Sequence, residues 1–164
     1  MPTFQDLLSR GYFPKELPPC FTTQMYGTSM DRDRNVLRPI FLNASAARNC
    51  PYNLARSRHI RRLLSIPNPI HYFNLSDIVT MHWGEIQTHT TQSPFSISKP
   101  VDGPAGKRAV LPQLNHAELL EHKGRSWKGY KYVCETDISE FYHSLYTHSI
   151  SWALHTKAIA KAQR

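Results

Sequence analysis

The run TDISEFYH, residues 136–143, says most about this chain, because it places a carboxylate shortly before an aromatic pair. It follows residues 130–135, where aromatic and β-branched side chains predict a strand. We therefore expect Asp137 at the end of a sheet, with the turn after it bringing Tyr142 back beside the same pocket. A carboxylate in that place is a ready ligand for a hard divalent cation, and a neighbouring aromatic edge can press on a bound sugar. The spacing also fits a simpler role, in which Asp137 caps a helix that begins one or two residues later.

This run resembles motif A of the reverse transcriptases, and its continuation YTHSISWALH, residues 146–155, resembles the bacterial antiphage-defence and abortive-infection group of that family. In these enzymes the motif A aspartate binds the catalytic magnesium, the next backbone carbonyl adds a ligand, and the second aromatic excludes ribose. The resemblance thus implies that Asp137 is the catalytic residue and that Asp137 and Ile138 are ligands of Mg²⁺. It also implies that Tyr142 contacts the incoming nucleotide.

A second stretch predicts a β-hairpin with a basic residue on each arm. Residues 93–99 and 107–111 alternate between apolar and polar side chains, and the turn formers DGPAG lie between them at 102–106. Lys99 and Arg108 then converge on one anion, or they are solvated edge charges that discourage aggregation. The pattern resembles the fingers hairpin of reverse transcriptases, in which the matching Lys and Arg hold the triphosphate. The resemblance therefore implies that Lys99 and Arg108 bind the nucleotide.

Composition and charge favour a nucleic-acid partner. The chain has 20 Lys and Arg against 12 Asp and Glu, a net charge of +8 that suits phosphate backbones. No apolar run approaches the roughly 20 residues of a membrane-spanning helix, and the N-terminus does not read as a signal peptide. Three widely spaced cysteines, without a Cys-x-x-Cys pair, indicate reduced thiols and no zinc site. We expect a cytoplasmic protein without a membrane partner.

The most basic segment is RSRHIRRLL, residues 56–64. As a helix it places Arg58, Arg61 and Arg62 on one face and its apolar residues on another. Two interpretations remain open: an ordinary amphipathic helix with a wet polar face, or guanidinium groups that bind the phosphates of an RNA template.

The first fifty residues read as an irregular lead after a short helix that Thr3 caps and that runs to Leu8. Prolines exclude regular helix from residue 14 to residue 20. The run GYFPKELPP, residues 11–19, resembles the opening segment of the same defence reverse transcriptases, and its aromatic residues are expected to pack under the fingers.

Two further helices are expected from capping residues and apolar spacing. Asn74 or Ser76 caps a helix that runs to about residue 88 and buries Trp83. Near the end of the sequence, Thr147 or Ser149 caps a helix toward residue 162. Its apolar stripe is expected to stay uncovered and to favour a partner chain or self-association.

The carboxylates that would complete a polymerase site are missing from the sequence. Two-metal chemistry needs several carboxylates, but Glu140 is the only acidic residue after Asp137, and no Asp-Asp pair occurs. Reverse transcriptases carry the further carboxylates in a Tyr-x-Asp-Asp hairpin downstream of motif A. The resemblance therefore covers only the fingers and the start of the palm, and we expect no polymerase activity from the isolated chain. A split polymerase half, an interrupted or truncated gene product and a non-catalytic module all remain open.

The expectation is thus an incomplete α+β polymerase domain. Residues 1–128 form the lead and a fingers-like region of helices and a β-hairpin, and residues 129–164 form the first strand and helix of a palm. The expected function is that of an N-terminal fragment or split half of an RNA-directed DNA polymerase in antiviral defence. Its partners would be an RNA template, nascent DNA, deoxynucleoside triphosphates and a second chain carrying the rest of the palm. A catalytically silent nucleic-acid-binding or assembly subunit is the alternative.

Overall fold

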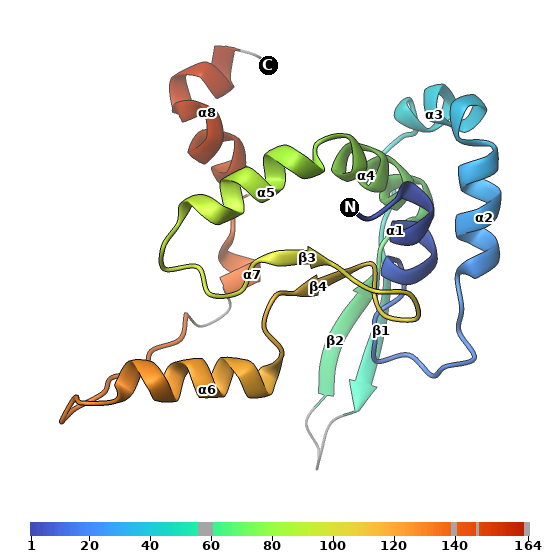
Figure 1. The fold of residues 1–164 in the computed structure, drawn as a ribbon. Helices are drawn as coiled ribbons and strands as arrows, with labels where there is room; N and C mark the ends of the chain where they lie inside the picture. Colours follow the sequence, from blue (N-terminus) through green and yellow to red (C-terminus); the bar gives the residue numbers. More distant parts are fainter. Residues whose placement is uncertain (56–60, 139–140, 147, 163–164) are drawn as a thin grey trace. The chain divides into compact units, whose positions relative to one another are not determined.

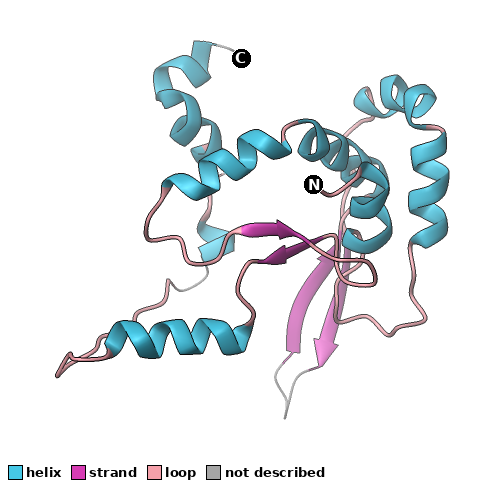
Figure 2. Ribbon diagram, in the orientation of Figure 1, coloured by secondary structure: helices cyan, strands magenta, loops and turns pink. Residues whose placement is uncertain are grey.

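The computed structural model describes residues 1–55, 61–138, 141–146 and 148–162, without the side chains at 142 and 143. The described residues have a mixed α+β fold with two small antiparallel sheets (Figures 1 and 2), so the predicted α+β class is confirmed. The chain consists of two compact units, Met1–Lys123 and Gly124–Arg164, and the boundary between them falls inside the helix His116–Trp127. In chain order, the elements are α1 (Phe4–Gly11), α2 (Gln24–Arg32), α3 (Arg34–Leu42), β1 (Cys50–Ala55), β2 (Arg61–Ile66), α4 (Pro69–Met81), α5 (Trp83–Gln92), β3 (Pro100–Asp102), β4 (Val110–Pro112), α6 (His116–Trp127), α7 (Phe141–Ser144) and α8 (Ser149–Ala162).

Helix α1 begins where the sequence predicts it. The Thr3 hydroxyl accepts a hydrogen bond from the Asp6 amide at 3.0 Å, and the Asp6 carboxylate accepts one from the Thr3 amide at 3.2 Å. This capping box satisfies two amides that the first helical turn leaves unpaired. The helix continues beyond Leu8 to Gly11, and Arg10 in its last turn forms an ion pair with Asp6.

The core of the first unit forms where α1 packs against α2 and α4, and α3 packs against α4. Phe4, Leu8 and Phe73 are at most 1% exposed and form its centre. The Phe4 and Phe73 rings meet edge to face with their centroids 4.9 Å apart, an arrangement that aromatic pairs favour. The first fifty residues thus contain α2 and α3, and the prediction of an irregular lead is wrong for them. The prediction that residues 14–20 contain no regular helix is confirmed.

A buried carboxylate joins α3 to α4. Asp77 is 3% exposed, accepts a hydrogen bond from Arg34 Nε at 2.8 Å and forms an ion pair with Arg38 Nε at 2.9 Å. The Arg34 guanidinium also lies 4.3 Å from the centre of the Phe4 ring. These contacts compensate the cost of removing the Asp77 charge from water.

The basic segment is not a helix where it is described. Arg61 and Arg62 begin β2, which pairs antiparallel with β1 in the register Ala55↔Arg61 and Leu54↔Arg62. Figure 1 shows this ribbon extending away from the helices of its unit. Arg58 and the rest of 56–60 lie outside the described residues. Cross-strand pairing with β1 decides the structure of Arg61 and Arg62, and a local helical spacing cannot reveal such pairing.

The helix predicted up to residue 88 consists of two helices with a different cap. The Asn68 side chain accepts hydrogen bonds from the amides of Ile70 and His71, so α4 starts before Asn74 and Ser76, which lie inside it. The backbone leaves helical geometry at His82, and α5 starts at the next residue. The predicted burial of Trp83 is confirmed, with 4% of the residue exposed.

The second unit lacks the predicted strand. Residues 130–135 are irregular, and the chain before them turns at Gly129, whose φ is 91°. No described strand pairs with this segment, so its backbone lacks the ladder partner that strand formation requires. Helix α8 confirms the predicted C-terminal helix, with a break in helical geometry at Thr156, and Ile150 and Leu154 on it are exposed.

The Asp77→Asn variant tests the buried ion pairs. It should lower the free energy of unfolding by about 3 kcal/mol, because it leaves two guanidinium groups without their buried counter-charge. Urea denaturation measures the change. The control is Asp33→Asn, which removes the charge from the exposed pair with Arg32 and should leave the free energy of unfolding nearly unchanged, because solvent screens that pair. Equal losses in the two variants would contradict the assigned role of Asp77.

Candidate functional site

The predicted β-hairpin is confirmed, although its strands are shorter than the alternating pattern indicates. Strands β3 and β4 pair antiparallel from Pro100↔Pro112 to Asp102↔Val110. Residues 93–99 are irregular and lie before the first strand. Lys99 thus lies just before β3 at the open end of the hairpin, where its carbonyl accepts a hydrogen bond from the Gln113 amide at 2.8 Å.

The turn of this hairpin is fastened to α1. Arg10 Nη1 donates hydrogen bonds to the carbonyl oxygens of Gly103, Pro104 and Lys107 at 3.2, 2.8 and 2.9 Å. The N-terminal ammonium lies 2.7 Å from the Asp102 carboxylate. A Cβ at Gly103 would lie 1.8 Å from the Arg108 carbonyl oxygen, so this tight turn requires glycine. Together these contacts fix the hairpin on the helical core.

Arg108 contributes to the same attachment. Its guanidinium donates hydrogen bonds to the carbonyl oxygens of Phe13 and Gly11 at 3.2 and 3.3 Å. It also lines a cavity of about 390 Å³ under the proline-rich segment that contains Pro14 and Pro18. The Arg108 side chain therefore joins the hairpin to the segment after α1 and remains partly exposed.

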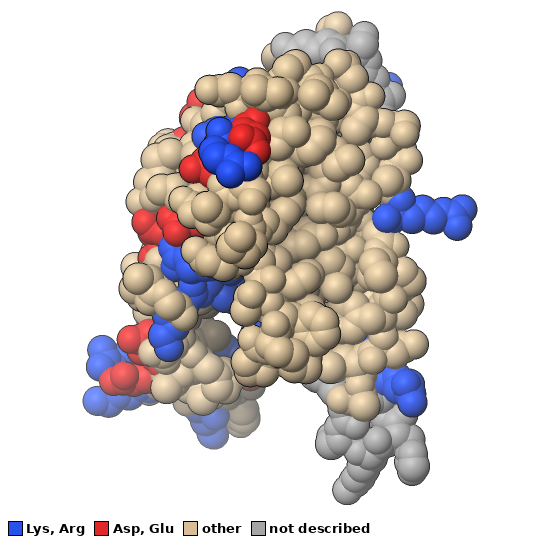
Figure 3. Space-filling view, turned by 90° about the vertical axis from the view of Figure 1, so that its right-hand side faces the viewer, with Lys and Arg blue, Asp and Glu red and all other residues tan. Residues whose placement is uncertain are grey.

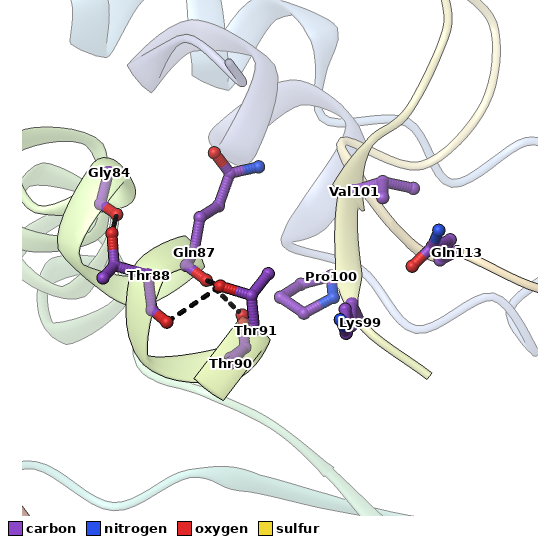
Figure 4. A pocket seen from close by; sticks show the side chains of 9 residues that line it. All are labelled: Gly84, Gln87, Thr88, Thr90, Thr91, Lys99, Pro100, Val101 and Gln113. Atoms are coloured by element: carbon purple, nitrogen blue, oxygen red, sulfur yellow. Dashed lines mark hydrogen bonds between the residues drawn. The ribbon is translucent and has the colours of Figure 1, made fainter. Parts of the chain in front are cut away.

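Lys99 borders a different cavity, also of about 390 Å³, between α5 and the open end of the hairpin (Figure 4). Its lining combines polar and apolar surface and consists of Gly84, Gln87, Thr88, Thr90, Thr91, Lys99, Pro100, Val101 and Gln113. The hydroxyls of Thr88 and Thr91 donate to carbonyls of α5 at 2.9 Å, which leaves their lone pairs as acceptors. We call this cavity the Lys99 cleft. It combines one ammonium donor with hydroxyl acceptors and two amide side chains.

Lys99 and Arg108 lie at different ends of the hairpin. Lys99 lies next to Pro100 at the open end, where its carbonyl bonds to Gln113. Arg108 precedes Ala109, whose carbonyl accepts a hydrogen bond from the Gly103 amide beside the turn. The two side chains line separate cavities, and their joint binding of one triphosphate stays a prediction.

The predicted motif A residues belong to the second unit. Asp137 and Ile138 are exposed and lie in an irregular segment, and Ile138 is 66% exposed. Tyr142 belongs to the short helix α7, but its side chain lies outside the described residues. Within the described part of the chain, no three His, Cys, Asp or Glu side chains form a group that could hold a metal ion. The metal and sugar-gate roles stay predictions.

Burial and nearby polar groups shift the pKa values of Asp6 and Tyr72. Burial raises the pKa of the Asp6 carboxyl, but hydrogen bonds from Thr3 and Arg10 outweigh that effect and leave the pKa below its ordinary value. The resulting stabilisation is present above about pH 4 and is lost as the pH falls through the lower pKa of the folded state. Burial also raises the pKa of Tyr72, and the nearby positive charge of Arg108 opposes that rise.

The β1–β2 ribbon presents the other predicted binding residues. Arg61 and Arg62 are exposed, and neither forms an ion pair with a described residue. Adjacent residues of a strand face opposite sides, so the two guanidinium groups lie on opposite faces of the ribbon. A two-stranded ribbon with exposed positive charge is a shape that proteins use to contact nucleic acid.

Sequence reasoning missed Arg10 and the threonines of α5. The spacing of Asp6 and Arg10 in the first helix is a local signal for an i, i+4 ion pair. Nothing local indicates that Arg10 also contacts a turn more than 90 residues away. Thr88, Thr90 and Thr91 could be recognised as an exposed polar helix face, but not as the wall of a cleft.

Comparison with protein-family models, curated proteins and solved structures finds no match for this chain. None of the described helices is long and apolar enough to cross a membrane. The candidate functional residues therefore have to be judged within each unit: the first unit contains the Lys99 cleft, the anchored hairpin and the basic ribbon, and the second contains the exposed Asp137.

A matched pair of variants separates anchoring from binding in the hairpin. Arg108→Gln should lower the free energy of unfolding by about 1.5 to 3 kcal/mol, because it removes charge-assisted hydrogen bonds to two carbonyls. Lys99→Gln should change stability by about 0.5 kcal/mol or less, as expected for a side chain outside the packed core. Urea denaturation of both variants provides the measurement. A loss at Lys99 as large as that at Arg108 would show that Lys99 is also structural.

Neutralising the ribbon tests its role in binding RNA. The Arg61→Gln/Arg62→Gln double variant should flatten the slope of log affinity against log salt by about 1.5 units, because each phosphate contact releases counterions. Fluorescence anisotropy of a labelled RNA over a range of salt concentrations measures the slope. Arg32→Gln is the control, since Arg32 is exposed but paired with Asp33. If the double variant keeps the wild-type slope, the two arginines do not contact phosphates.

Proposed function

We propose that residues 1–164 provide the fingers and the beginning of the palm of an RNA-directed DNA polymerase that acts in bacterial antiviral defence. The observation that carries the proposal is the anchored hairpin, which places Lys99 at the edge of a polar cleft. A nucleotide carries anionic phosphate oxygens and N–H donors on most of its bases. The cleft offers a partner for each: an ammonium donor and hydroxyl acceptors.

The two basic residues of the hairpin have different roles in this proposal. Lys99 contacts a phosphate of the incoming deoxynucleotide as a compact, mobile point charge. Arg108 holds the hairpin through Gly11 and Phe13 and contributes positive potential without touching the same phosphate. The proposal therefore changes the role that the resemblance alone implies for Arg108.

Asp137 and the Ile138 carbonyl would hold Mg²⁺, which is the metal that oxygen ligands of this kind suit. When bound, the metal neutralises charge on the reacting phosphates and activates the attacking hydroxyl. Tyr142 would lie beside the sugar and exclude a 2′-hydroxyl. Palm residues outside residues 1–164 would supply the remaining carboxylates.

The template would contact the basic ribbon. Arg61 and Arg62 are exposed at the start of β2, and the whole chain has a net charge of +8. Contacts to phosphates give affinity without sequence preference, as a polymerase that copies different templates requires.

A silent binding or assembly subunit is the second candidate, and the surface of α2 and α3 favours it. Met25, Val36, Ile40 and Leu42 are each at least 57% exposed on these helices. Figure 3 views this side of the first unit, where uncharged surface predominates. Exposed apolar side chains at this density suit a contact with another protein.

Primer extension distinguishes the two candidates. The chain, combined with the polypeptide that carries the remaining palm, should extend a primer on an RNA template in the presence of Mg²⁺. Asp137→Asn should reduce synthesis by several orders of magnitude and leave RNA binding intact, because it removes the charge that the metal requires. Asp31→Asn, another exposed carboxylate, is the matched control and should remain active.

Two results would contradict the polymerase proposal. An active Asp137→Asn enzyme would remove the assigned metal ligand. Failure of every combination to extend a primer, with RNA binding intact, would favour the silent subunit.

A further inference from the structure

The second unit contains an aromatic pocket that the motif A assignment does not use. The rings of Tyr146 and Trp152 lie 5.4 Å apart, those of Tyr146 and His148 lie 5.0 Å apart, and the His148 and Trp152 planes differ by 23°. Lys157 and Lys161 complete the lining of a cavity of about 230 Å³. We call this cavity the Trp152 pocket.

A local break in α8 creates the pocket. Five helical residues advance by about 500°, so an unbroken helix would place Lys157 some 140° around the axis from Trp152. Thr156 instead has φ 66° and ψ 156°, and Lys157 Nζ lies 5.0 Å from the centre of the Trp152 ring. Positive φ is costly for a β-branched residue. Strained backbone of this kind often accompanies a functional site.

The charges around the pocket select an anionic ligand. Residues 141–164 contain no Asp or Glu, while Lys157 and Lys161 are both exposed at the rim. These ammonium groups repel the cationic ligands that aromatic cages otherwise bind. The pocket therefore suits a molecule that carries a flat ring and a neighbouring negative charge.

The size and exposure of the Trp152 pocket limit the kind of ligand that it can bind. Its volume of about 230 Å³ is below the roughly 300 Å³ at which cavities for drug-sized ligands begin, so it suits one ring system of a larger chain. Tyr146 is 57% exposed, which leaves an aromatic surface open to solvent. An unpaired base can stack on such a surface, whereas the bases of a duplex cannot reach it.

We propose that the Trp152 pocket binds an unpaired base of single-stranded nucleic acid, with the base stacked on the aromatic rings and a flanking phosphate at Lys157 and Lys161. Stacking is tolerant of sequence because every base has a π-face, so the site takes RNA or DNA. This binding goes beyond the proposed polymerase function and does not depend on it, since a silent subunit would carry the same pocket.

Anisotropy titrations of the full chain test the site with three labelled oligomers of equal length: oligouridine, oligodeoxythymidine and an abasic strand that keeps the phosphates. Trp152→Ala should weaken binding of both base-containing strands about tenfold, the effect of losing one stacked base, and leave abasic-strand binding unchanged. Lys161→Gln should weaken all three. Trp127→Ala, which removes another partly exposed tryptophan of the same unit, is the matched control and should bind as the wild type does.

Trp152→Phe keeps an aromatic face and should restore at least half of the lost affinity, which separates stacking from a failure to fold. Equal loss of the abasic and base-containing strands in Trp152→Ala would overturn the proposal. So would wild-type affinity of Trp152→Ala for oligouridine and oligodeoxythymidine, or competition by an acidic peptide as effective as competition by the oligomers. A lack of primer extension in the assembled enzyme would leave these binding results unaffected.

Discussion

The Arg10 guanidinium and the carbonyls of the β3–β4 turn are the contact on which the candidate site depends. One nitrogen, Nη1, donates to three carbonyl oxygens of a turn that lies far away in the sequence. Asp6 orients the guanidinium by an ion pair within α1, and the capping box fixes Asp6 in turn. This chain of contacts runs from the first helical turn to the hairpin. These contacts fix the position of the hairpin, and therefore the position of Lys99 in the Lys99 cleft.

Features with a local chemical cause could be predicted from the sequence. The capping residue Thr3 identified the start of the first helix, since its bonds are made within one turn. The turn formers at 102–106 identified the hairpin, because a turn depends on the conformations of a few adjacent residues. Apolar spacing placed Trp83 in the core. The α+β class follows from these elements, whereas the polymerase-like architecture remains a prediction.

Features that depend on distant partners could not be predicted in this way. Arg61 and Arg62 have helical spacing, but pairing with β1 makes them part of a strand. Helix α2 was not predicted from the sequence. Its Gly27 allows close packing on α1, because a Cβ there would lie 1.9 Å from the Ser9 hydroxyl oxygen. The sequence also suggested that Arg108 shares a phosphate with Lys99. In the structure Arg108 donates hydrogen bonds to carbonyls of the segment after α1, a contact with distant residues that the sequence does not indicate.

The position of a bound triphosphate relative to Lys99 decides whether this residue contacts the incoming nucleotide. A deoxynucleoside triphosphate that carries an acyl group on its γ-phosphate transfers the acyl group to an amine beside that phosphate, and mass spectrometry then locates the label. In the assembled enzyme, Lys99 should be acylated, and unmodified deoxynucleotide should suppress this labelling. Lys107, exposed on the turn of the same hairpin, should remain unlabelled. Label on Lys107 rather than Lys99, or labelling of Lys99 that deoxynucleotide does not suppress, would contradict the account.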